Sequence, residues 1–396
     1  MQPPAPAFFV AIACGGTGGH LFPGLAVAEE LQRRHCEITL LVSAKDVDQQ
    51  AVRSRLDMSV VTLPAVGMTR RNVLGFWKSF FSSYRQSKRL FAQNAPDAVL
   101  AMGGFTSVPP LLAARKSART FLHESNTIPG RANRWLAHFV DHAFVYFHEA
   151  SGRMSNARIE VTGMPVREQI REPMEAAAAR MALNLDPAKP VLLVMGGSQG
   201  AKAINDLLIA SLPQLANAFP DLQFIHLTGP ADAPRVDEVY RVLKRRAVVR
   251  SFFTEMEFAL HAATAAITRA GASTLAELAA LRLPAILLPF PAAADNHQYY
   301  NALAFAETGA ARMSLQNELA PQRLIQWIGE LTNGEEERTE MQEALARWDT
   351  PGAAARIADF VVASFASGRT GVYPKPLLAG DFNAQHRRSV VSSLSI

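Results

Sequence analysis

The sequence predicts an α/β protein of two Rossmann-like domains, each built on a doubly wound parallel sheet. Short apolar runs recur along the 396 residues, and each precedes a turn and then a helical pattern, which is typical of parallel strands joined by right-handed crossovers. One opening occurs twice, as FFVAIACGGTGGH and as PVLLVMGGSQGA, about 180 residues apart. This repeat favours two domains over one large sheet.

The expected strands follow from the apolar runs in order. After the run at 8–13, the first half contains EITLLVSA (37–44), PDAVLAMGG (96–104), RTFLHES (119–125), HAFVYF (142–147) and RIEVTG (158–163). The second half contains PVLLVMGG (190–197), QFIHLTG (223–229), AAITRAG (265–271) and PAILLPFP (284–291). We expect an N-terminal domain over 1–165 and a C-terminal domain over 166–348. The helical stretch at about 349–367 fits either domain, and the tail at 368–396 has no periodic pattern and is expected to be flexible.

Composition excludes several classes of protein. Hydrophobic residues make up 49% of the chain and the formal net charge is +5, which fits a packed soluble protein and calls for no nucleic-acid partner. Cys14 and Cys36 are too few for a disulfide framework. No stretch reaches the roughly 18 apolar residues of a membrane span, and the N-terminus leads directly into the first strand, so it is not expected to be a signal peptide.

Three glycine-rich turns follow expected strands, at 15–19, 103–104 and 196–200. When a glycine turn without side chains joins a strand to a helix, free N–H groups and the positive end of the helix dipole point to one site. Such a site suits a phosphate or a sugar. The alternative is that these glycines only permit tight packing of strand on helix. The pattern does not match G-x-G-x-x-G, and no Gly-Lys-Ser/Thr follows, so a dinucleotide site and a P-loop are both disfavoured.

Acidic and polar side chains supply further candidates. The pair Asp46 and Asp48 resembles a manganese-binding D-x-D, although acids at a helix start are more often dipole partners. Glu277 can accept hydrogen bonds from both hydroxyls of a ribose, or can simply compensate a helix dipole, and Ser273 or Thr274 is expected to cap that helix. His123, Glu124 and Asn126 follow a buried strand and are functional candidates at that sheet edge, with solvation of a loop as the alternative. A denser group suits sugar hydroxyls, although Asp295 can simply be a helix cap: Asp295, Asn296, His297, Gln298 and Asn301.

The stretch 66–90 has six basic residues and no acid. At helical spacing Leu74, Trp77, Phe81 and Tyr84 share one face, and basic residues line its flank. This pattern is typical of a helix on an anionic membrane surface, and a crossover helix packed on the core is the alternative. The candidate membrane contacts are Trp77, Lys78, Phe80, Phe81 and Arg85.

Seven motifs stand in a fixed order: GGTGGHLFPGLAVAEEL, MGGFTSVPPLLAA, HESNTIPGRANRWLA, GMPVR, GGSQGAKAIN, RAGASTLAEL and PFPAAADNHQYYNA. In this order they resemble the MurG family of bacterial N-acetylglucosaminyltransferases, which convert lipid I to lipid II in peptidoglycan synthesis. The likeness runs from about residue 8 to 365. Each motif is weak alone, but seven in order are highly specific.

The resemblance implies a GT-B fold, in which two Rossmann-like domains face each other across a cleft and the helix at 349–367 returns to the N-terminal domain. It implies UDP-N-acetylglucosamine as the donor, held mostly by the C-terminal domain. Glu277 would bind the ribose, Phe253 would border the uracil and Gln298 would bind the sugar. The remaining implied donor residues are Thr17, Gly18, Gly19, Asn126, Arg167, Ser198, Ala272, Ser273, Thr274, Leu275 and Ala276.

The implied acceptor is lipid I, an undecaprenyl-diphosphate-linked muramyl peptide whose 4-hydroxyl attacks the anomeric carbon with inversion. Its diphosphate would meet the first two glycine turns, at Gly15, Gly16, Gly103 and Gly104. His20 is the expected catalytic base because an unperturbed imidazole titrates near neutrality; Glu124 is the second candidate, and a structural role for the histidine is the alternative. Turn amides and helix dipoles would stabilise the leaving diphosphate, so no cofactor is expected to be required, although a divalent metal can stimulate.

The resemblance also places the protein at the cytoplasmic face of the bacterial inner membrane, as a peripheral enzyme with cell-wall synthesis or division proteins as further partners. Four positions depart from the family pattern: Ser125 replaces the usual glutamine, Met164 an asparagine, Phe105 a frequent tyrosine and Phe253 an aliphatic residue. Two other functions stay open. A UDP-sugar 2-epimerase has the same architecture, and a non-catalytic protein can bind a sugar nucleotide without transferring it.

Overall fold

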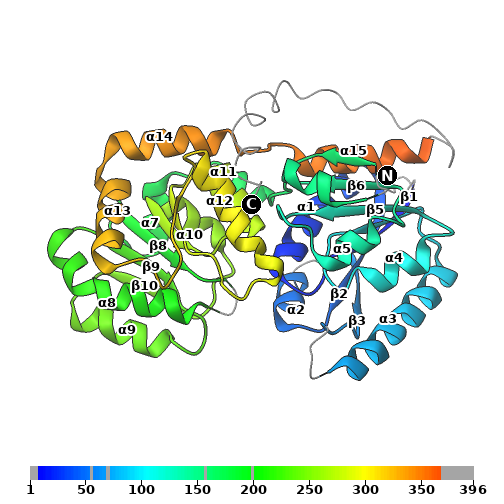
Figure 1. Cartoon of the computed structure of the whole chain (residues 1–396), viewed down its shortest axis with the longest axis horizontal. Coiled ribbons are helices and arrows are strands. Elements are labelled where there is room, and N and C mark those ends of the chain that lie inside the picture. Colours follow the sequence, from blue (N-terminus) through cyan, green and yellow to red (C-terminus); the bar gives the residue numbers. More distant parts are fainter. Residues whose placement is uncertain (1–7, 54–56, 68–71, 156–157, 198–199, 367–396) are drawn as a thin grey trace, which may run out of the picture.

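The structure is a computed structural model that describes residues 8–53, 57–67, 72–155, 158–197 and 200–366. Two parallel sheets lie one beyond the other along the long axis, each covered by helices (Figure 1). Their strand orders are β3-β2-β1-β4-β5-β6-β7 and β10-β9-β8-β11-β12-β13. Both sheets therefore begin with the 3-2-1-4-5 order of doubly wound nucleotide-binding domains, which confirms the predicted fold class.

All strand pairs in these sheets are parallel. The first sheet contains β1 Phe8–Ala13, β2 Cys36–Ser43, β3 Ser59–Leu63, β4 Ala98–Ala101, β5 Arg119–Glu124, β6 His142–Val145 and β7 Ile159–Val161. The second contains β8 Val191–Met195, β9 Gln223–Leu227, β10 Ala247–Arg250, β11 Ala265–Thr268, β12 Ala285–Leu287 and β13 Arg312–Met313.

Helices connect the strands across both faces of each sheet. The N-terminal set is α1 Gly18–Arg33, α2 Asp46–Val52, α3 Val73–Gln93, α4 Val108–Ala114, α5 Arg131–Leu136 and the 3-10 helix η1 His148–Arg153. The C-terminal set is α6 Glu168–Arg171, α7 Ala176–Ala182, α8 Lys202–Ala218, α9 Ala233–Val242, α10 Met256–Ala262, α11 Ala272–Leu281, η2 Ala294–Asn296, α12 His297–Glu307, α13 Pro321–Asn333 and α14 Glu335–Ala346, and the last described helix of the chain is α15 Ala353–Ala366.

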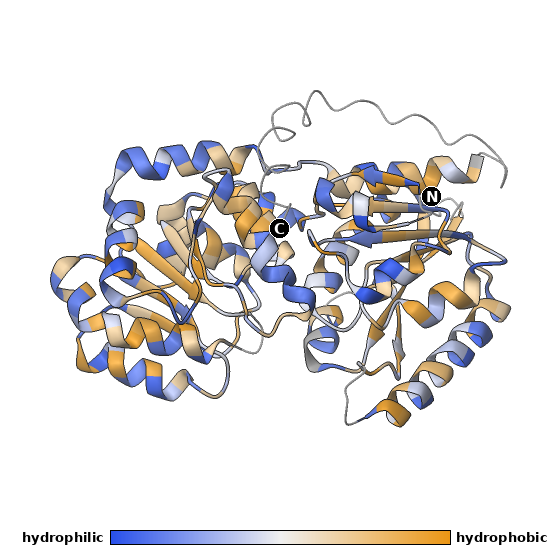
Figure 2. Ribbon diagram, in the orientation of Figure 1, coloured by the Kyte–Doolittle hydropathy of each residue, from blue (hydrophilic) through white to orange (hydrophobic). Residues whose placement is uncertain are grey.

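The central strands are buried on both faces, because helices cover each side of the sheet. Every residue of β4, β5, β8 and β11 is buried, and Figure 2 shows the strands of both sheets as mostly hydrophobic. The sequence did not predict three strands, namely β3, β10 and β13. They lie at sheet edges and are mostly half-buried or exposed, so their sequences lack the continuous apolar run of a covered strand.

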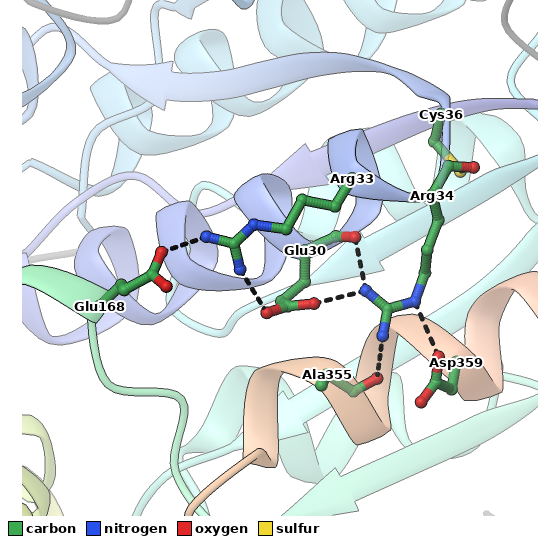
Figure 3. A network of polar contacts seen from close by, with 7 residues as sticks. All are labelled: Glu30, Arg33, Arg34, Cys36, Glu168, Ala355 and Asp359. Carbon is green, nitrogen blue, oxygen red and sulfur yellow. Dashed lines mark hydrogen bonds and ion pairs between the residues drawn. The ribbon is translucent and has the colours of Figure 1, made fainter. Parts of the chain in front are cut away.

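The last helix, α15, packs against α1 of the N-terminal domain. Ile357, Ala358 and Val361 are buried in the same cluster as the residues of β1 and α1. Polar contacts reinforce this packing (Figure 3): the Arg34 guanidinium binds Glu30, the Ala355 carbonyl and the Asp359 carboxylate, the last at 2.7 Å. The chain thus leaves the first domain after β7 and returns to it after α14, while the exact limits of the two domains stay a prediction.

Candidate active site between the domains

A cavity of about 760 Å³ lies between the two domains. It is large enough for a nucleotide sugar, since small-ligand sites usually measure about 300–1,000 Å³. The N-terminal domain contributes the β1–α1 turn and the loop after β5, and the C-terminal domain contributes the start of α11 and the loops after β10 and β12. Of the predicted site residues, the lining includes Thr17, Gly18, Gly19, His20, Gly104, Glu124, Asn126, Arg167, Phe253, Ala272, Ser273, Thr274, Glu277 and Gln298.

The first two glycines of the β1–α1 turn do not line this cavity. A Cβ on Gly15 would lie 2.3 Å from the Ser43 amide, so this residue is glycine because β1 and β2 pack closely. Gly16 has a φ of +110° and donates its amide to the Asp48 carboxylate at 2.6 Å. Burial and this hydrogen bond leave neither residue free for a phosphate, so the prediction that Gly15 and Gly16 hold the acceptor diphosphate is corrected.

Asp48 supports the β1–α1 turn and does not line the cavity, and the side chain of Asp46, the other half of the predicted D-x-D pair, lies outside the described residues. The Oδ2 of Asp48 accepts hydrogen bonds from the amides of Gly16 and Ser43 and from the Ser43 hydroxyl, at 2.5–3.1 Å, and the side chain is buried. Lys45 also holds this turn, because its Nζ donates to the Gly16 carbonyl at 2.7 Å. Among the described residues, no cluster of three or more acidic, histidine or cysteine side chains is placed to hold a metal ion.

His20 lies against the second glycine turn. Cβ atoms built on Gly103 and Gly104 would fall 3.0–3.1 Å from the imidazole ring, and both residues have positive φ. The ring Nδ1 contacts the Thr17 hydroxyl at 3.1 Å, which orients the imidazole. Burial is the main cause that lowers the pKa of His20 to about 4, although the nearby Asp48 opposes it. The ring is therefore neutral at pH 7, and Gly103, buried beneath it, does not line the cavity.

Glu124 holds the loop after β5 through four hydrogen bonds to its carboxylate. Its Oε1 accepts hydrogen bonds from the amide and side chain of Asn126 at 2.8 and 3.0 Å, and its Oε2 accepts from the Gly130 amide and the Asn133 side chain at 2.9 and 2.7 Å. Burial raises the pKa of this carboxyl, and the four donors oppose that shift. A carboxylate with four donors is poorly placed to take a proton, so its geometry indicates loop positioning.

Arg167 and Glu277 face each other on the donor side of the cavity. Their Nη2 and Oε1 atoms lie 3.4 Å apart, and the side chains are 12% and 13% exposed. The guanidinium also stacks over the Phe22 ring of α1, 4.2 Å from its centroid. Burial raises the pKa of Glu277, and Arg167 opposes that shift. Phe22 was missed by sequence reasoning, and its place within the glycine-turn motif was the available signal.

The start of α11 presents backbone to the cavity. Gly271 is the N-cap residue, so the prediction that Ser273 or Thr274 caps this helix is wrong; both lie in the first turn and line the cavity. Leu275 and Ala276 are buried and do not line it, because on a helix they point to the core. Leu275 and Ala276, which were predicted as donor residues, therefore have no side chain facing the cavity. The first helical amides, which lack partners within the helix, can bind an anion.

The turn after β8 contains two glycines that pack against other residues and one that is open to the cavity. A Cβ on Gly196 would lie 2.2 Å from the Ala201 Cβ, and one on Gly200 would lie 2.2 Å from the Thr228 carbonyl. Gly197 has a φ of +111°, meets nothing within 4 Å and lines the cavity. Ser198, the predicted diphosphate ligand, lies outside the described residues.

Contacts across the cavity join the two domains directly. The Ser273 hydroxyl donates to the Gly19 carbonyl at 3.2 Å. Asn301 of α12, which we expected near a sugar, is instead buried and bound to Thr127 and Asn126 of the other domain. Gln298 lines the cavity, and its Oε1 accepts the Phe290 amide at 3.0 Å. The side-chain NH2 group of Gln298 is therefore the part that can bind a ligand.

The helix α3 lies at the outer edge of the N-terminal domain, away from the C-terminal domain (Figure 1), and none of its residues lines the cavity. Leu74, Trp77 and Phe81 are exposed to 87%, 48% and 54%, and Phe76, Trp77, Phe80 and Phe81 form one ring cluster with centroids 5.3–6.2 Å apart. Its other face, with Ser83, Ser87 and Phe91, is buried. Within the described part of the chain, no helix has both the length and the apolar character needed to cross a bilayer.

Two doubly wound domains that share a nucleotide-sized cavity define a GT-B-type sugar-nucleotide enzyme. The model of the glycosyltransferase family 28 N-terminal domain matches residues 10–145, and that of the family 28 C-terminal domain matches residues 191–357. Together the two models reach every described strand except β7, so the similarity extends over both domains.

Curated relatives are similar along most of the chain. A UDP-N-acetylglucosamine--N-acetylmuramyl-(pentapeptide) pyrophosphoryl-undecaprenol N-acetylglucosamine transferase of Pelobacter propionicus is 38% identical over 81% of this chain and 90% of its own length. One from Anaeromyxobacter sp. is 36% identical over 88% and 91%. The crystal structure of Acinetobacter baumannii MurG has a TM-score of 0.68 at 26% identity, covering 90% of this chain and 99% of that one.

The chain therefore belongs to glycosyltransferase family 28 and, within it, to the MurG family of N-acetylglucosamine transferases. The predicted family and the predicted hexosyltransferase class are both confirmed. A UDP-N-acetylglucosamine 2-epimerase of Neisseria meningitidis has a TM-score of 0.66 at only 15% identity. That likeness shows a shared fold and gives the epimerase alternative no support in sequence.

Proposed function

We propose that this chain transfers N-acetylglucosamine from UDP-N-acetylglucosamine to the 4-hydroxyl of the muramyl sugar of lipid I, with inversion, to give lipid II and UDP. The observation that carries the proposal is the cavity between the domains, which is lined by the β1–α1 turn on one side and by Arg167, Glu277 and the start of α11 on the other. A donor bound to the C-terminal domain would there present its anomeric carbon to an acceptor held by the N-terminal domain.

The decisive experiment supplies labelled UDP-N-acetylglucosamine and a lipid I analogue. The proposal expects the disaccharide lipid and UDP in equal amounts. Release of free N-acetylmannosamine from the donor alone would support the epimerase instead. Donor binding with no transfer and no epimerisation would indicate a non-catalytic protein.

His20 is the base in this proposal. It is neutral because of its lowered pKa, it lines the cavity, and the Thr17 hydroxyl orients it. Glu124 would act indirectly by holding the loop that carries Asn126. His20→Ala should therefore abolish transfer in a folded protein. Near-normal turnover of His20→Ala, with Glu124→Ala inactive but folded, would reverse the two roles.

We further propose that transfer has no essential metal requirement. The departing diphosphate would be stabilised by the amides at the start of α11, by the open turn at Gly197 and by Arg167. The helix dipole alone supplies only about 0.3–2 kcal/mol, so directed hydrogen bonds must contribute more. Asp48, committed to the β1–α1 turn, is unavailable as a ligand facing the donor. Activity should persist in EDTA; complete loss in EDTA, restored by manganese, contradicts this proposal.

The ring cluster on α3, with Lys78 and Arg85 exposed beside it, supports peripheral binding to the anionic cytoplasmic face of the inner membrane. Trp77→Glu and Lys78→Glu should each weaken binding to vesicles that contain anionic lipid. Lys189→Glu, which changes a partly exposed lysine of the donor domain by the same charge, is the matched control. Equal binding of all four proteins would reject this surface.

A further inference from the structure

The loop after β5 meets the start of α12 through a three-residue ion cluster that crosses the domain boundary. The Asp295 carboxylate accepts from Arg131 at 2.9 Å and from Arg134 at 2.6 Å. Both arginines belong to α5 of the N-terminal domain, and Asp295 precedes His297 and Gln298 in the C-terminal domain. One carboxylate thus holds two cations from the opposite domain, and Asp295 and Arg131 line the cavity together with His297 and Gln298.

The backbone at this point is strained. Asp295 and Asn296 have φ values of +49° and +56°, in the left-handed region that costs energy for residues other than glycine, although least for aspartate and asparagine. Two such residues in succession persist when the surrounding structure imposes them. The strained pair sets the direction in which α12 begins, and therefore where His297 and Gln298 point.

A second set of contacts lies one turn further along α12. The Asn301 Oδ1 accepts from the amide and hydroxyl of Thr127 at 3.0 and 2.9 Å, while its Nδ2 donates to the Asn126 side chain and to the Ala270 carbonyl. Asn301 is fully buried. The helix α12 and the segment before it are therefore held against the N-terminal domain at two places, Asp295 and Asn301. The outer contact is ionic and the inner one is a network of neutral hydrogen bonds.

We propose that Asp295 is a positioning residue: its ion pairs with Arg131 and Arg134 form when the domains close and hold the strained start of α12, so that His297 and Gln298 are set against the donor sugar in the closed enzyme. The inference rests on the proposed function, because the sugar end of the donor is assigned to this part of the cavity. The nucleotide end, near Glu277, does not depend on the cluster.

Partial exposure makes the cluster sensitive to salt. Asp295 is 26% exposed, Arg134 41% and Arg131 79%, so solvent ions reach the pairs and screen them. The two arginines lower the pKa of Asp295, Arg131 most strongly, and the carboxylate is charged throughout the neutral range. Since these charges lie on different domains, screening weakens the closed form and leaves each separate domain intact.

Asp295→Asn is the sharpest test. Asparagine tolerates the left-handed backbone, so the variant removes the charge and keeps the conformation available. We expect kcat for transfer to fall about three- to tenfold, the range expected from losing two partly exposed pairs, while Kd for UDP stays unchanged. Added salt should lower kcat of the wild type towards that of the variant and should affect the variant less.

Asp206→Asn is the matched control. Asp206 also pairs with two cations, Lys202 and Arg235, both at 2.6 Å, but all three lie within the donor domain and outside the cavity lining. This control should keep wild-type kcat and its salt dependence. A fall in kcat equal to that of Asp295→Asn would overturn the proposal, because loss of any double ion pair would then have the same effect.

A mutant cycle completes the test. Arg131→Gln with Arg134→Gln should lower kcat as Asp295→Asn does, and the triple variant should be no worse than either, because all remove one interaction. Additive losses, or a wild-type kcat in Asp295→Asn, would overturn the positioning role. If the wild type itself transfers no sugar to a lipid I analogue, the proposed function fails instead, and the two failures are thereby distinguished.

Discussion

At His20, the surroundings of the side chain decide its chemistry. The ring lies on two glycines whose positive φ values bring the backbone beneath it, and the Thr17 hydroxyl fixes one ring nitrogen. The sequence predicted an imidazole poised near neutrality. The structure instead lowers its pKa to about 4 by burial, so the group is a permanently neutral proton acceptor in the physiological range.

The pH dependence of turnover should reflect this shift. A base acts only when deprotonated, so activity is lost as pH falls through its pKa. With His20 as the base, the acidic limb of kcat should be centred below pH 5, in place of about 6.5 for an unperturbed imidazole. A steady-state profile from pH 4.5 to 8, with protein stability checked at each pH, should therefore show no midpoint above pH 5. A midpoint between 6 and 7 would contradict the assignment.

Gly104→Ala should disable the site with little effect elsewhere. Its φ is +76° and an added Cβ would lie 3.0 Å from the His20 ring, so the substitution strains the backbone and displaces the base. We expect at least a tenfold loss of kcat, equivalent to about 1.4 kcal/mol, measured in the transfer assay. Gly152→Ala, where a Cβ meets nothing within 4 Å, is the control. Full activity of Gly104→Ala would show that His20 need not occupy this place.

At the scale of elements, most of the strands that the sequence predicted are those that the fold buries, and the edge strand β7, which is half-buried or exposed, is the exception. β1, β4, β5, β8 and β11 are apolar because helices cover both faces. The edge strands β3, β10 and β13 were missed, since half-covered strands carry no such signal. The sequence could not distinguish two kinds of glycine. Gly15 is needed for close packing and Gly197 is open to the cavity, yet a glycine in a turn gives the same sequence signal in both cases.

The helix α15 should be an integral part of the N-terminal domain. Ile357 is fully buried among residues of β1 and α1, so Ile357→Ala should lower the free energy of unfolding by roughly 2–5 kcal/mol. Asp359→Ala, on the same helix, loses a pair in which its side chain is 67% exposed and should cost less than about 1 kcal/mol. Urea denaturation measures both. Equal, small effects would mean that α15 is only loosely attached.

At the scale of the whole molecule, buried histidines link stability to pH. Burial lowers the pKa of His123 and His142 to about 4 and of His226 to about 3, from an ordinary 6.5. Below pH 6.5 the unfolded chain therefore binds protons that the folded chain does not. Their contribution to stability is complete above pH 6.5 and is lost as the pH falls towards 4.

Between pH 7 and 5.5 each of these three histidines should cost about 1 kcal/mol of unfolding free energy. Because the pKa of His20 is lowered to about 4 in the same way, urea denaturation at the two pH values should show a combined loss of about 4 kcal/mol from the four rings. His226→Asn, which removes one of the titrating rings, should show a smaller pH dependence, whatever its stability at pH 7. Stability that is unchanged over this interval would mean that these rings titrate normally in the folded protein.

The sequence by itself determined the two-domain α/β architecture and the family, and most of the catalytic and substrate-binding residues that it predicted line the cavity. It could do so because covered strands must be apolar and because seven local motifs keep their order. Only the tertiary structure decided which members of a motif face the ligand and which face the core. Gly16 and Asp48 hold a turn, Glu124 holds a loop and Asn301 joins the domains. Each of these roles depends on a partner at least six and up to 175 residues away, and no local pattern specifies a contact at such separations.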